Sequence, residues 1–200
     1  MCQLFETLRI EDGQVLNANY HLQRMNRSRY ELGISRQAFT NLAPFKLDNY
    51  LSKGMSYRCR IDYSTVIQAI TLSKYVYTPI KKLKVVRTNQ LTYAHKFADR
   101  SQLNFYRNQW PAFDDILLVV KDRITDASIG NIVFWDGINF VTPKSPLLPG
   151  TQRNYLLDKK IVNEEELLLN DLQRFTSWSI INALRPLQFN EFKPISQVYV

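Results

Sequence analysis

The chain has 200 residues, of which 45% are hydrophobic and 22% charged, a composition typical of one globular domain or of two small lobes that share a core. No apolar run approaches the roughly 18 residues of a membrane span. The start, MCQLFETLRIEDG, carries acids where a signal peptide needs a basic start and an apolar core. We therefore expect a cytoplasmic protein without a membrane partner.

The net charge of +8 favours anionic ligands without pointing to one class of them. The 26 basic residues are scattered, and no basic run is longer than a pair such as Lys81-Lys82. Small phosphates and carboxylates explain the excess as well as nucleic acid does, so we expect small-molecule ligands and no nucleic acid. Cys2 and Cys59 have no metal-ligand spacing and are expected to be free thiols.

The first part of the chain predicts a hairpin, a basic helix and further strands. Residues 3–10, QLFETLRI, form a strand that the turn Glu11-Asp12-Gly13 returns into a second strand. Helical spacing over 21–33 ends at Gly33, a natural C-cap, and each of the helix arginines Arg24, Arg27 and Arg29 taken alone is interpreted as solvated. A second helix is expected over 35–52, interrupted near Pro44, followed by strands over 57–64, 66–77 and 81–88.

The second part of the chain alternates strands with helical patterns. A helical pattern within 91–110 ends at Pro111, and Asp136-Gly137 is the favoured pair for a type I′ hairpin turn. Strands are expected over 114–120, 132–135, 138–143 and 176–182, with helices from Thr151 onward and over 164–175. The pattern of residues changes between positions 77 and 89. We therefore predict an α+β fold with two lobes, 1–83 (α+β) and 84–200 (α/β).

The stretch from Ile124 to Arg153 gathers several features that point to a ligand site. Asp126 precedes a turn of small residues and Asn131, and a loop rich in Pro and Gly leads into the helix at Thr151. The unpaired N–H groups and the dipole of a helix start favour an anion there. Most such junctions bind nothing, so the prediction depends on what the rest of the chain supplies.

The absence of other motifs limits the classes of reaction that the chain could catalyse. The sequence has no GxGxxG, no Walker loop, no GxSxG and no histidine pair for zinc, so we expect no metal. What remains is Lys96, flanked by His95 and Arg100, together with Asp126 and the helix start at Thr151. A lysine nucleophile, a carboxylate and an anion site are the parts of a pyridoxal 5'-phosphate (PLP) site. The residues alone leave this interpretation open beside that of a solvated lysine.

Five blocks along the chain together resemble the class IV aminotransferase family. They read FETLR followed by HLQRM, YAHKFADR, DDILLVV with ITDASIGNIVFWDG, LLPGTQR, and INALRPL. This family comprises fold-type IV PLP enzymes and includes branched-chain and D-amino-acid aminotransferases and 4-amino-4-deoxychorismate lyase. The resemblance implies PLP as cofactor, a two-lobed fold whose C-terminal lobe carries the Schiff-base lysine and the phosphate site, and a homodimer. Relative to the family, the chain is shortened before the FET-like strand.

The resemblance also implies roles for individual residues. Lys96 matches the Schiff-base lysine, and Asp126 stands where the family usually has the glutamate that contacts the pyridine nitrogen. The remaining matches are Arg24, Thr151, Gln152 and Asn182 at the cofactor phosphate, and Arg100 at the substrate in the lyase branch. For three neighbours the structural interpretation is preferred or left open: His21 as a hydrogen-bonding residue, Asn131 as a bridge across its turn, and Arg153 as a partner of the 164–166 region.

Two departures from the family pattern bear on the activity. Asp126 is one methylene shorter than glutamate, which predicts a longer contact to the ring or a closer backbone, and the shortened start removes a segment that shapes the substrate pocket. The resemblance favours 4-amino-4-deoxychorismate lyase, which eliminates pyruvate to give 4-aminobenzoate for folate. The alternatives are an aminotransferase for a small amino acid and, in another class, a non-catalytic basic protein that binds RNA or a partner through its arginine-rich helix.

Overall fold

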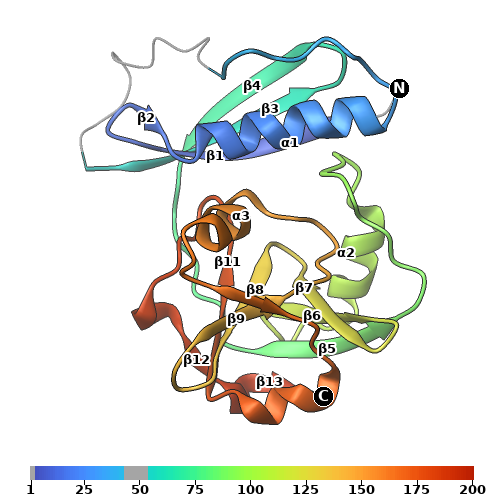
Figure 1. Ribbon diagram of the computed structural model, residues 1–200, viewed down its shortest axis with the longest axis vertical. Helices are drawn as coiled ribbons and strands as arrows, with labels where there is room; N and C mark the ends of the chain where they lie inside the picture. The colour runs from blue at the N-terminus through green and yellow to red at the C-terminus, as the bar shows by residue number, and fades with distance from the viewer. Residues whose placement is uncertain (1–2, 43–53) are drawn as a thin grey trace. The chain divides into compact units, whose positions relative to one another are not determined.

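The computed structural model describes residues 3–42 and 54–200, which belong to two compact units. The first unit lies within residues 1–77 and takes in 95–99, and the second comprises 78–94 and 100–200 (Figure 1). Unlike the predicted lobes, 1–83 and 84–200, these units divide at Tyr77, and Lys96 belongs to the first of them. In the described part of the chain, no helix is long and apolar enough to cross a membrane.

The first unit is an antiparallel sheet with one long helix against it (Figure 1). The strands lie in the order β2-β1-β3-β4, and β1 pairs with β3 along its whole length. The alternation predicted for β1 holds, because Leu4, Leu8 and Ile10 share a core with Met25 of the helix. The elements are β1 (Leu4–Glu11), β2 (Gln14–Val15), α1 (Ala18–Glu31), β3 (Ser56–Tyr63) and β4 (Ile67–Lys74).

Positive φ angles set the ends of these elements. The β1–β2 turn places Asp12 at φ 45° and Gly13 at φ 79°, the left-handed conformations that a tight hairpin needs. Gly33 follows α1 at φ 64°, as the predicted C-cap requires. The prediction that the helix arginines are solvated is wrong for Arg24 and Arg29, which are buried.

The helix predicted over 35–52 is wrong for residues 35–42, which are irregular, and residues 43–53 lie outside the described part. Side chains of α1 form hydrogen bonds with backbone groups in residues 35–42, which a helix would use for its own hydrogen bonds. Asn26 donates to the carbonyl of Phe39 at 2.9 Å and accepts from its N–H at 2.8 Å. Arg29 donates to the carbonyl of Gln37 at 2.8 Å. These tertiary hydrogen bonds replace the helical ones.

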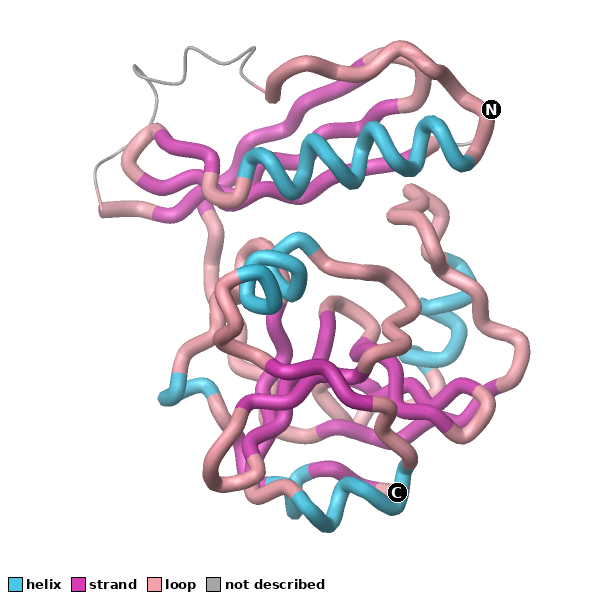
Figure 2. The backbone as a smooth tube through the Cα atoms, viewed as in Figure 1, coloured by secondary structure: helices cyan, strands magenta, loops and turns pink. Residues whose placement is uncertain are grey.

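The second unit is a mixed nine-stranded sheet with short helices (Figure 2). Its main path runs β10-β9-β8-β7-β6-β5-β13, and β11 pairs with β8 and β12. The strands are β5 (Leu83–Thr88), β6 (Asp115–Val120), β7 (Arg123–Ala127), β8 (Asn131–Trp135), β9 (Phe140–Pro143), β10 (Asn163–Glu165), β11 (Ser177–Ile181), β12 (Lys193–Pro194) and β13 (Val198–Tyr199). The helices are α2 (Ser101–Asn108) and α3 (Thr151–Asp158), with 3₁₀ turns η1 (Leu169–Arg174), η2 (Phe189–Glu191) and η3 (Ile195–Gln197).

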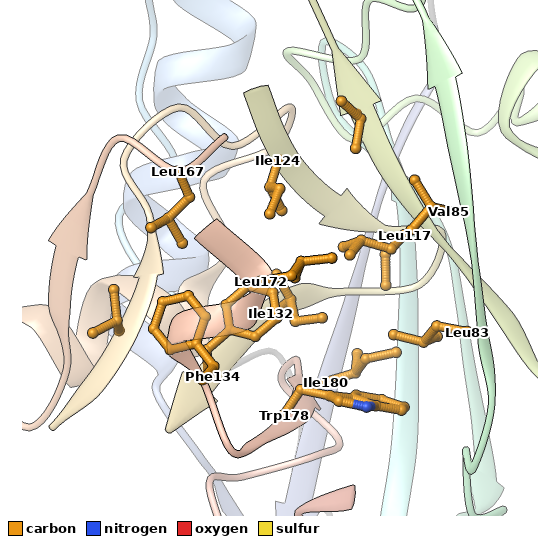
Figure 3. Close-up of a cluster of buried hydrophobic side chains, with 14 of the residues drawn as sticks. Leu83, Val85, Leu117, Ile124, Ile132, Phe134, Leu167, Leu172, Trp178 and Ile180 are labelled. Carbon is orange, nitrogen blue, oxygen red and sulfur yellow. The ribbon is translucent and has the colours of Figure 1, made fainter. Parts of the chain in front are cut away.

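Strands of this sheet enclose an apolar core (Figure 3). Phe134 of β8 stacks on Phe175, with ring centroids 4.8 Å apart, and Trp178 of β11 is 1% exposed beside them. Leu83 of β5 and Leu117 of β6 extend the same cluster. The core fixes the register of β8 against β11, and therefore the positions of the residues at the ends of these strands.

Two local predictions in this unit are corrected. The β8–β9 hairpin forms, but only Gly137 of its central pair has a positive φ, so the turn is not type I′. Instead the Asp136 carboxylate accepts from the N–H groups of Ile138 and Asn139, both at 2.7 Å. The helix expected over 164–175 is replaced by β10, which pairs in parallel with β9, and by the η1 turn. Pairing with the sheet outweighs the helical propensity of the Glu- and Leu-rich run.

Candidate active site

Lys96 lies in an irregular segment that pairs with the start of β1. The Phe5 N–H donates to the Lys96 carbonyl at 3.0 Å, and Leu4 and Phe97 form an antiparallel bridge. This pairing places the Lys96 side chain beside the Phe5 side chain, and the Lys96 Nζ lies 4.7 Å from the centroid of the Phe5 ring. Lys96 is half-buried. The lysine is therefore held by the sheet of the first unit and not by the helical pattern that the sequence suggested around it.

Arg24 of α1 forms a buried cluster with two residues of the same unit. Its Nε donates to the Oε1 of Glu6 at 2.8 Å and its Nη2 to the Oε2 at 2.5 Å. The His21 Nδ1 lies 2.7 Å from the same Oε2. Glu6 and His21 are completely buried, and Arg24 is 7% exposed. The interpretation of His21 as a hydrogen-bonding residue is confirmed.

The charges in this cluster compensate one another. Burial alone would raise the pKa of Glu6, but Arg24 and His21 together hold that pKa well below its usual range. Burial, together with the charges of Arg24 and Lys96, lowers the pKa of His21 below its usual value despite the neighbouring Glu6, which favours the neutral imidazole at pH 7. Since Glu6 is ionised, the Nδ1 of His21 is the donor to it. The cluster thus consists of one neutralised ion pair and one neutral imidazole.

Asn131 lies at the centre of a hydrogen-bonded group in the second unit. Its Nδ2 donates to the Asp126 Oδ1 at 2.7 Å and to the Leu148 carbonyl at 2.9 Å. Its Oδ1 accepts from the Gly150 N–H at 3.1 Å, immediately before α3 begins at Thr151. The other oxygen of Asp126 accepts from the Leu148 N–H at 2.9 Å. Asn131 thus bridges its turn, as predicted, and links Asp126 to the start of α3.

Asp126 is a buried carboxylate without an ion-pair partner in the described part of the chain. Burial raises its pKa to about 6, although hydrogen bonds from Leu148 and Asn131 favour the charged form. Arg153, whose charge acts on Asp126, pairs instead with Glu164 at 2.7 Å and donates to the Pro143 carbonyl at 2.8 Å. The predicted pairing of Arg153 with the 164–166 region is confirmed. A cationic group near Asp126 would recover the cost of this burial.

Two glycines allow the surrounding segments to approach closely. A Cβ on Gly150 would clash with the Oδ1 of Asn131, and a Cβ on Gly130 would clash with the Ile181 carbonyl and lie 3.2 Å from the Cβ of Asn182. Asn182 donates from its Nδ2 to the Ile129 carbonyl at 3.0 Å. The end of β11, the turn after Asp126 and the start of α3 therefore form one packed arrangement.

The start of α3 suits an anion. Gly150 provides no side-chain cap, and no acidic residue occupies the first turn. Thr151 and Gln152 are both buried there. The unpaired N–H groups of a helix start and its dipole favour negative charge.

Arg100 also belongs to the second unit, close to the same turn. Its Nη2 donates to the Ser128 carbonyl at 2.5 Å, and its Nε is buried without a hydrogen-bond partner. Of the predicted site residues, the structure thus places Lys96 and Arg24 in the first unit. Asp126, Thr151, Gln152, Asn182 and Arg100 lie in the second.

Sequence reasoning missed Glu6. The alternation of β1 could have revealed it, because Glu6 lies on the same face as the buried Leu4 and Leu8. A carboxylate at such a position needs a buried cation, and the basic helix that follows supplies Arg24.

The fold is that of the fold-type IV transaminases. A hypothetical aminotransferase from Mycobacterium tuberculosis, solved with PLP bound, shares this fold with a TM-score of 0.73 at 16% identity, covering 92% of this chain and 78% of that one. The family model of amino-transferase class IV matches residues 3–189. This chain belongs to the amino-transferase class IV family.

Similar proteins cover nearly the whole chain. An uncharacterised protein of Haemophilus influenzae is 36% identical over 193 residues, 94% of this chain and 100% of that protein. A crystal structure from Haemophilus somnus, provisionally named a 4-amino-4-deoxychorismate lyase, is 32% identical with a TM-score of 0.83, covering 94% of this chain and 98% of that one. A crystal structure from Mesorhizobium loti, provisionally named an amino-acid aminotransferase, is 25% identical with a TM-score of 0.76, covering 97% and 98%.

These comparisons settle the broad class of the protein. The chain is a PLP-dependent enzyme of the class IV aminotransferase and lyase family. The alternative of a non-catalytic basic binding protein is therefore wrong.

Proposed function

We propose that the enzyme is a 4-amino-4-deoxychorismate lyase, which eliminates pyruvate from its substrate and leaves 4-aminobenzoate, a step towards folate. The observation that carries this proposal is the 32% identity, over 94% of the chain, to the Haemophilus somnus protein provisionally named for that activity. Arg100 and the INALRPL segment, which resemble the lyase branch, support it.

The residues present fit PLP in two respects. Asp126 is buried and its pKa is raised to about 6, so a protonated ring nitrogen would supply the opposite charge that the protein lacks there. The start of α3, with neither a side-chain cap nor an acid, suits a phosphate. We propose that Thr151 and Gln152 hold the phosphate together with Asn182 and Arg24, and that Asp126 holds the ring nitrogen.

The cofactor, when bound, supplies an aldehyde that takes up amines and a ring that accepts electrons. The protein supplies proton transfer and orientation. The Lys96 Nζ takes the proton from the substrate carbon that bears the amino group, then returns a proton to the product. Asp126 keeps the ring nitrogen protonated, and Arg100 binds a substrate carboxylate.

The test is pyruvate release from 4-amino-4-deoxychorismate by the purified enzyme with PLP, with Lys96→Ala as the variant. We expect Lys96→Ala to lose activity by at least about a thousandfold, together with the absorbance of lysine-bound cofactor, because no other group replaces its amine. Lys74→Ala, which removes an exposed lysine of β4 in the same unit, is the control and should behave as wild type. Pyruvate release that survives in Lys96→Ala would contradict the assignment of this lysine.

A second candidate function is an aminotransferase for a small amino acid, favoured by the likeness to the Mesorhizobium loti protein. The two activities differ in what leaves the enzyme. Transfer of an amino group to 2-oxoglutarate without pyruvate release would establish the aminotransferase and exclude the lyase.

We propose in addition that the enzyme is cytoplasmic and, as the family resemblance implies, a homodimer. Light scattering on the purified protein should then give twice the chain mass of 23.5 kDa. A mass equal to that of one chain would contradict the dimer.

A further inference from the structure

The Phe5 ring of β1 lies beside two cationic side chains. The Lys96 Nζ is 4.7 Å from the ring centroid, and the Arg60 Cζ is 4.1 Å from it. Phe5 is 3% exposed, although it alternates with Leu4 and Glu6 and so lies on the sheet face opposite the α1 core. A ring face attracts a cation within about 6 Å, more strongly where water is excluded.

Arg60 is neutralised by a neighbour on its own strand. Its Nε and Nη2 donate to the Asp62 carboxylate at 2.9 and 2.6 Å, and Asp62 is paired with Phe5 in the β1–β3 register. The bidentate pair removes most of the repulsion that an isolated guanidinium would exert on a second cation beside the same ring.

Two histidines near Lys96 bind other side chains. His21 acts on Lys96 electrostatically but is bound to Glu6, which faces the helix side of the sheet. His95, the neighbour of Lys96 in sequence, lies 3.2 Å from the Ser28 Oγ through its Nδ1 and 3.8 Å from Glu31 through its Nε2. The Phe5 ring is thus a contact that β1 offers to the ammonium group of Lys96.

We propose that Phe5 is a positioning residue for Lys96, holding its ammonium group against the start of β1 with the Arg60–Asp62 pair as the neutral neighbour that permits this. The inference rests on the proposed function for its significance in catalysis. In that function the amine of Lys96 reacts as a free base, so it must first lose its proton and leave the Phe5 ring. The contact between Phe5 and Lys96 itself does not depend on that function.

The test measures the reactivity of Lys96 in the full chain without PLP. Trace acetylation over pH 7–11, with the Lys96 peptide quantified by mass spectrometry, gives the midpoint at which the amine becomes nucleophilic. Phe5→Leu keeps an apolar side chain but removes the ring, so we expect the midpoint to fall by about half a unit, or about threefold faster labelling at pH 8. Phe5→Tyr keeps the ring face and should match wild type.

Two further variants make the result specific. Phe39→Leu removes a different cation–π pair of the same unit, in which the Arg29 Cζ lies 3.8 Å from the Phe39 centroid, and should leave Lys96 labelling unchanged. Asp62→Asn leaves the charge of Arg60 uncompensated, and should lower the Lys96 midpoint in the same direction as Phe5→Leu.

The inference is overturned if Phe5→Leu labels like wild type while its circular dichroism is unchanged, or if Phe39→Leu shifts the midpoint equally. Should Phe5→Leu fail to fold, Phe5→Met, which also lacks the ring, takes its place: an unshifted midpoint refutes the proposal and a lowered one supports it. Because labelling needs no cofactor, the expected shifts in a protein that neither binds PLP nor releases pyruvate would refute the proposed function and leave the positioning role standing.

Discussion

Replacing Asp126 by Asn should stabilise the second unit at neutral pH. The pKa of Asp126 is raised by burial from 3.8 to about 6, a difference of about 2 units, and each unit corresponds to about 1.4 kcal/mol. Keeping this carboxylate ionised at pH 8 therefore costs the folded state about 3 kcal/mol. Asn removes that cost.

The substitution also loses a hydrogen bond. Asp126 accepts from the Asn131 side chain and from the Leu148 N–H, whereas Asn can accept one of these and must turn its own amide donor towards the other. The loss of one hydrogen bond costs about 1 kcal/mol. The net expectation at pH 8 is a gain of about 2 kcal/mol in the free energy of unfolding.

The pH dependence gives the sharper test. Between about pH 4 and 6 the folded protein holds a proton on Asp126 that the unfolded chain has released, so wild-type stability falls as pH rises through this range. Asp126→Asn lacks this slope. The variant should therefore be less stable than wild type at pH 4 and more stable at pH 8, with a crossover between the two pKa values.

Urea denaturation followed by tryptophan fluorescence measures this directly. All three tryptophans, Trp110, Trp135 and Trp178, belong to the second unit, so their emission reports on the unit that holds Asp126. Asp122→Asn is the control, because Asp122 is exposed in the β6–β7 turn at φ 63°, a conformation that Asn tolerates. A stability difference between Asp126→Asn and wild type that does not change from pH 4 to pH 8 would refute the reasoning.

Two further substitutions test the remaining buried groups. Glu6→Gln should cost about 3 kcal/mol at pH 7, because it leaves the buried Arg24 without a counter-charge. Since the folded pKa of Glu6 is depressed, its contribution is present above the unfolded value of 4.5 and is lost as pH falls below it. Equal acid sensitivity of wild type and Glu6→Gln in urea denaturation followed by circular dichroism would contradict this. Gly150→Ala should cost about 1–3 kcal/mol, because its Cβ meets the Oδ1 of Asn131. An unchanged melting temperature for Gly150→Ala would contradict this prediction, because the loop would then accommodate the added methyl group without loss of stability.

Elements whose own residues carry the periodicity could be predicted from the sequence. The alternation of β1, the helical spacing of α1 and the start of α3 at Thr151 all need only local information. The 164–175 run could not be predicted in the same way, because its helical composition is opposed by the edge of β9, about 22 residues earlier, and nothing in the run itself indicates that pairing. Local propensity decides only where no distant backbone offers better hydrogen bonds.

The residues of the candidate site likewise divide into those that the local sequence predicts and those that it does not. The structural roles of Asn131 and Arg153 are predicted correctly, because their contacts lie within about twenty residues in one compact stretch. The link between Glu6 and Arg24 depends on how α1 packs on β1, which no spacing of residues reveals. The Phe5 ring beside Lys96 requires a pairing between segments about ninety residues apart in the chain.

The two buried acids differ in the one respect that matters for a ligand. Glu6 has its cation within the protein, so its pKa is depressed and its charge is a stable part of the fold. Among the described residues Asp126 has hydrogen bonds but no ion-pair partner, so burial raises its pKa and its charge destabilises the fold. A buried charge that the protein leaves uncompensated is stabilised by whatever cationic group binds there. This asymmetry explains why Asp126, and not the better-bonded Glu6, is the carboxylate that suits a protonated ring nitrogen.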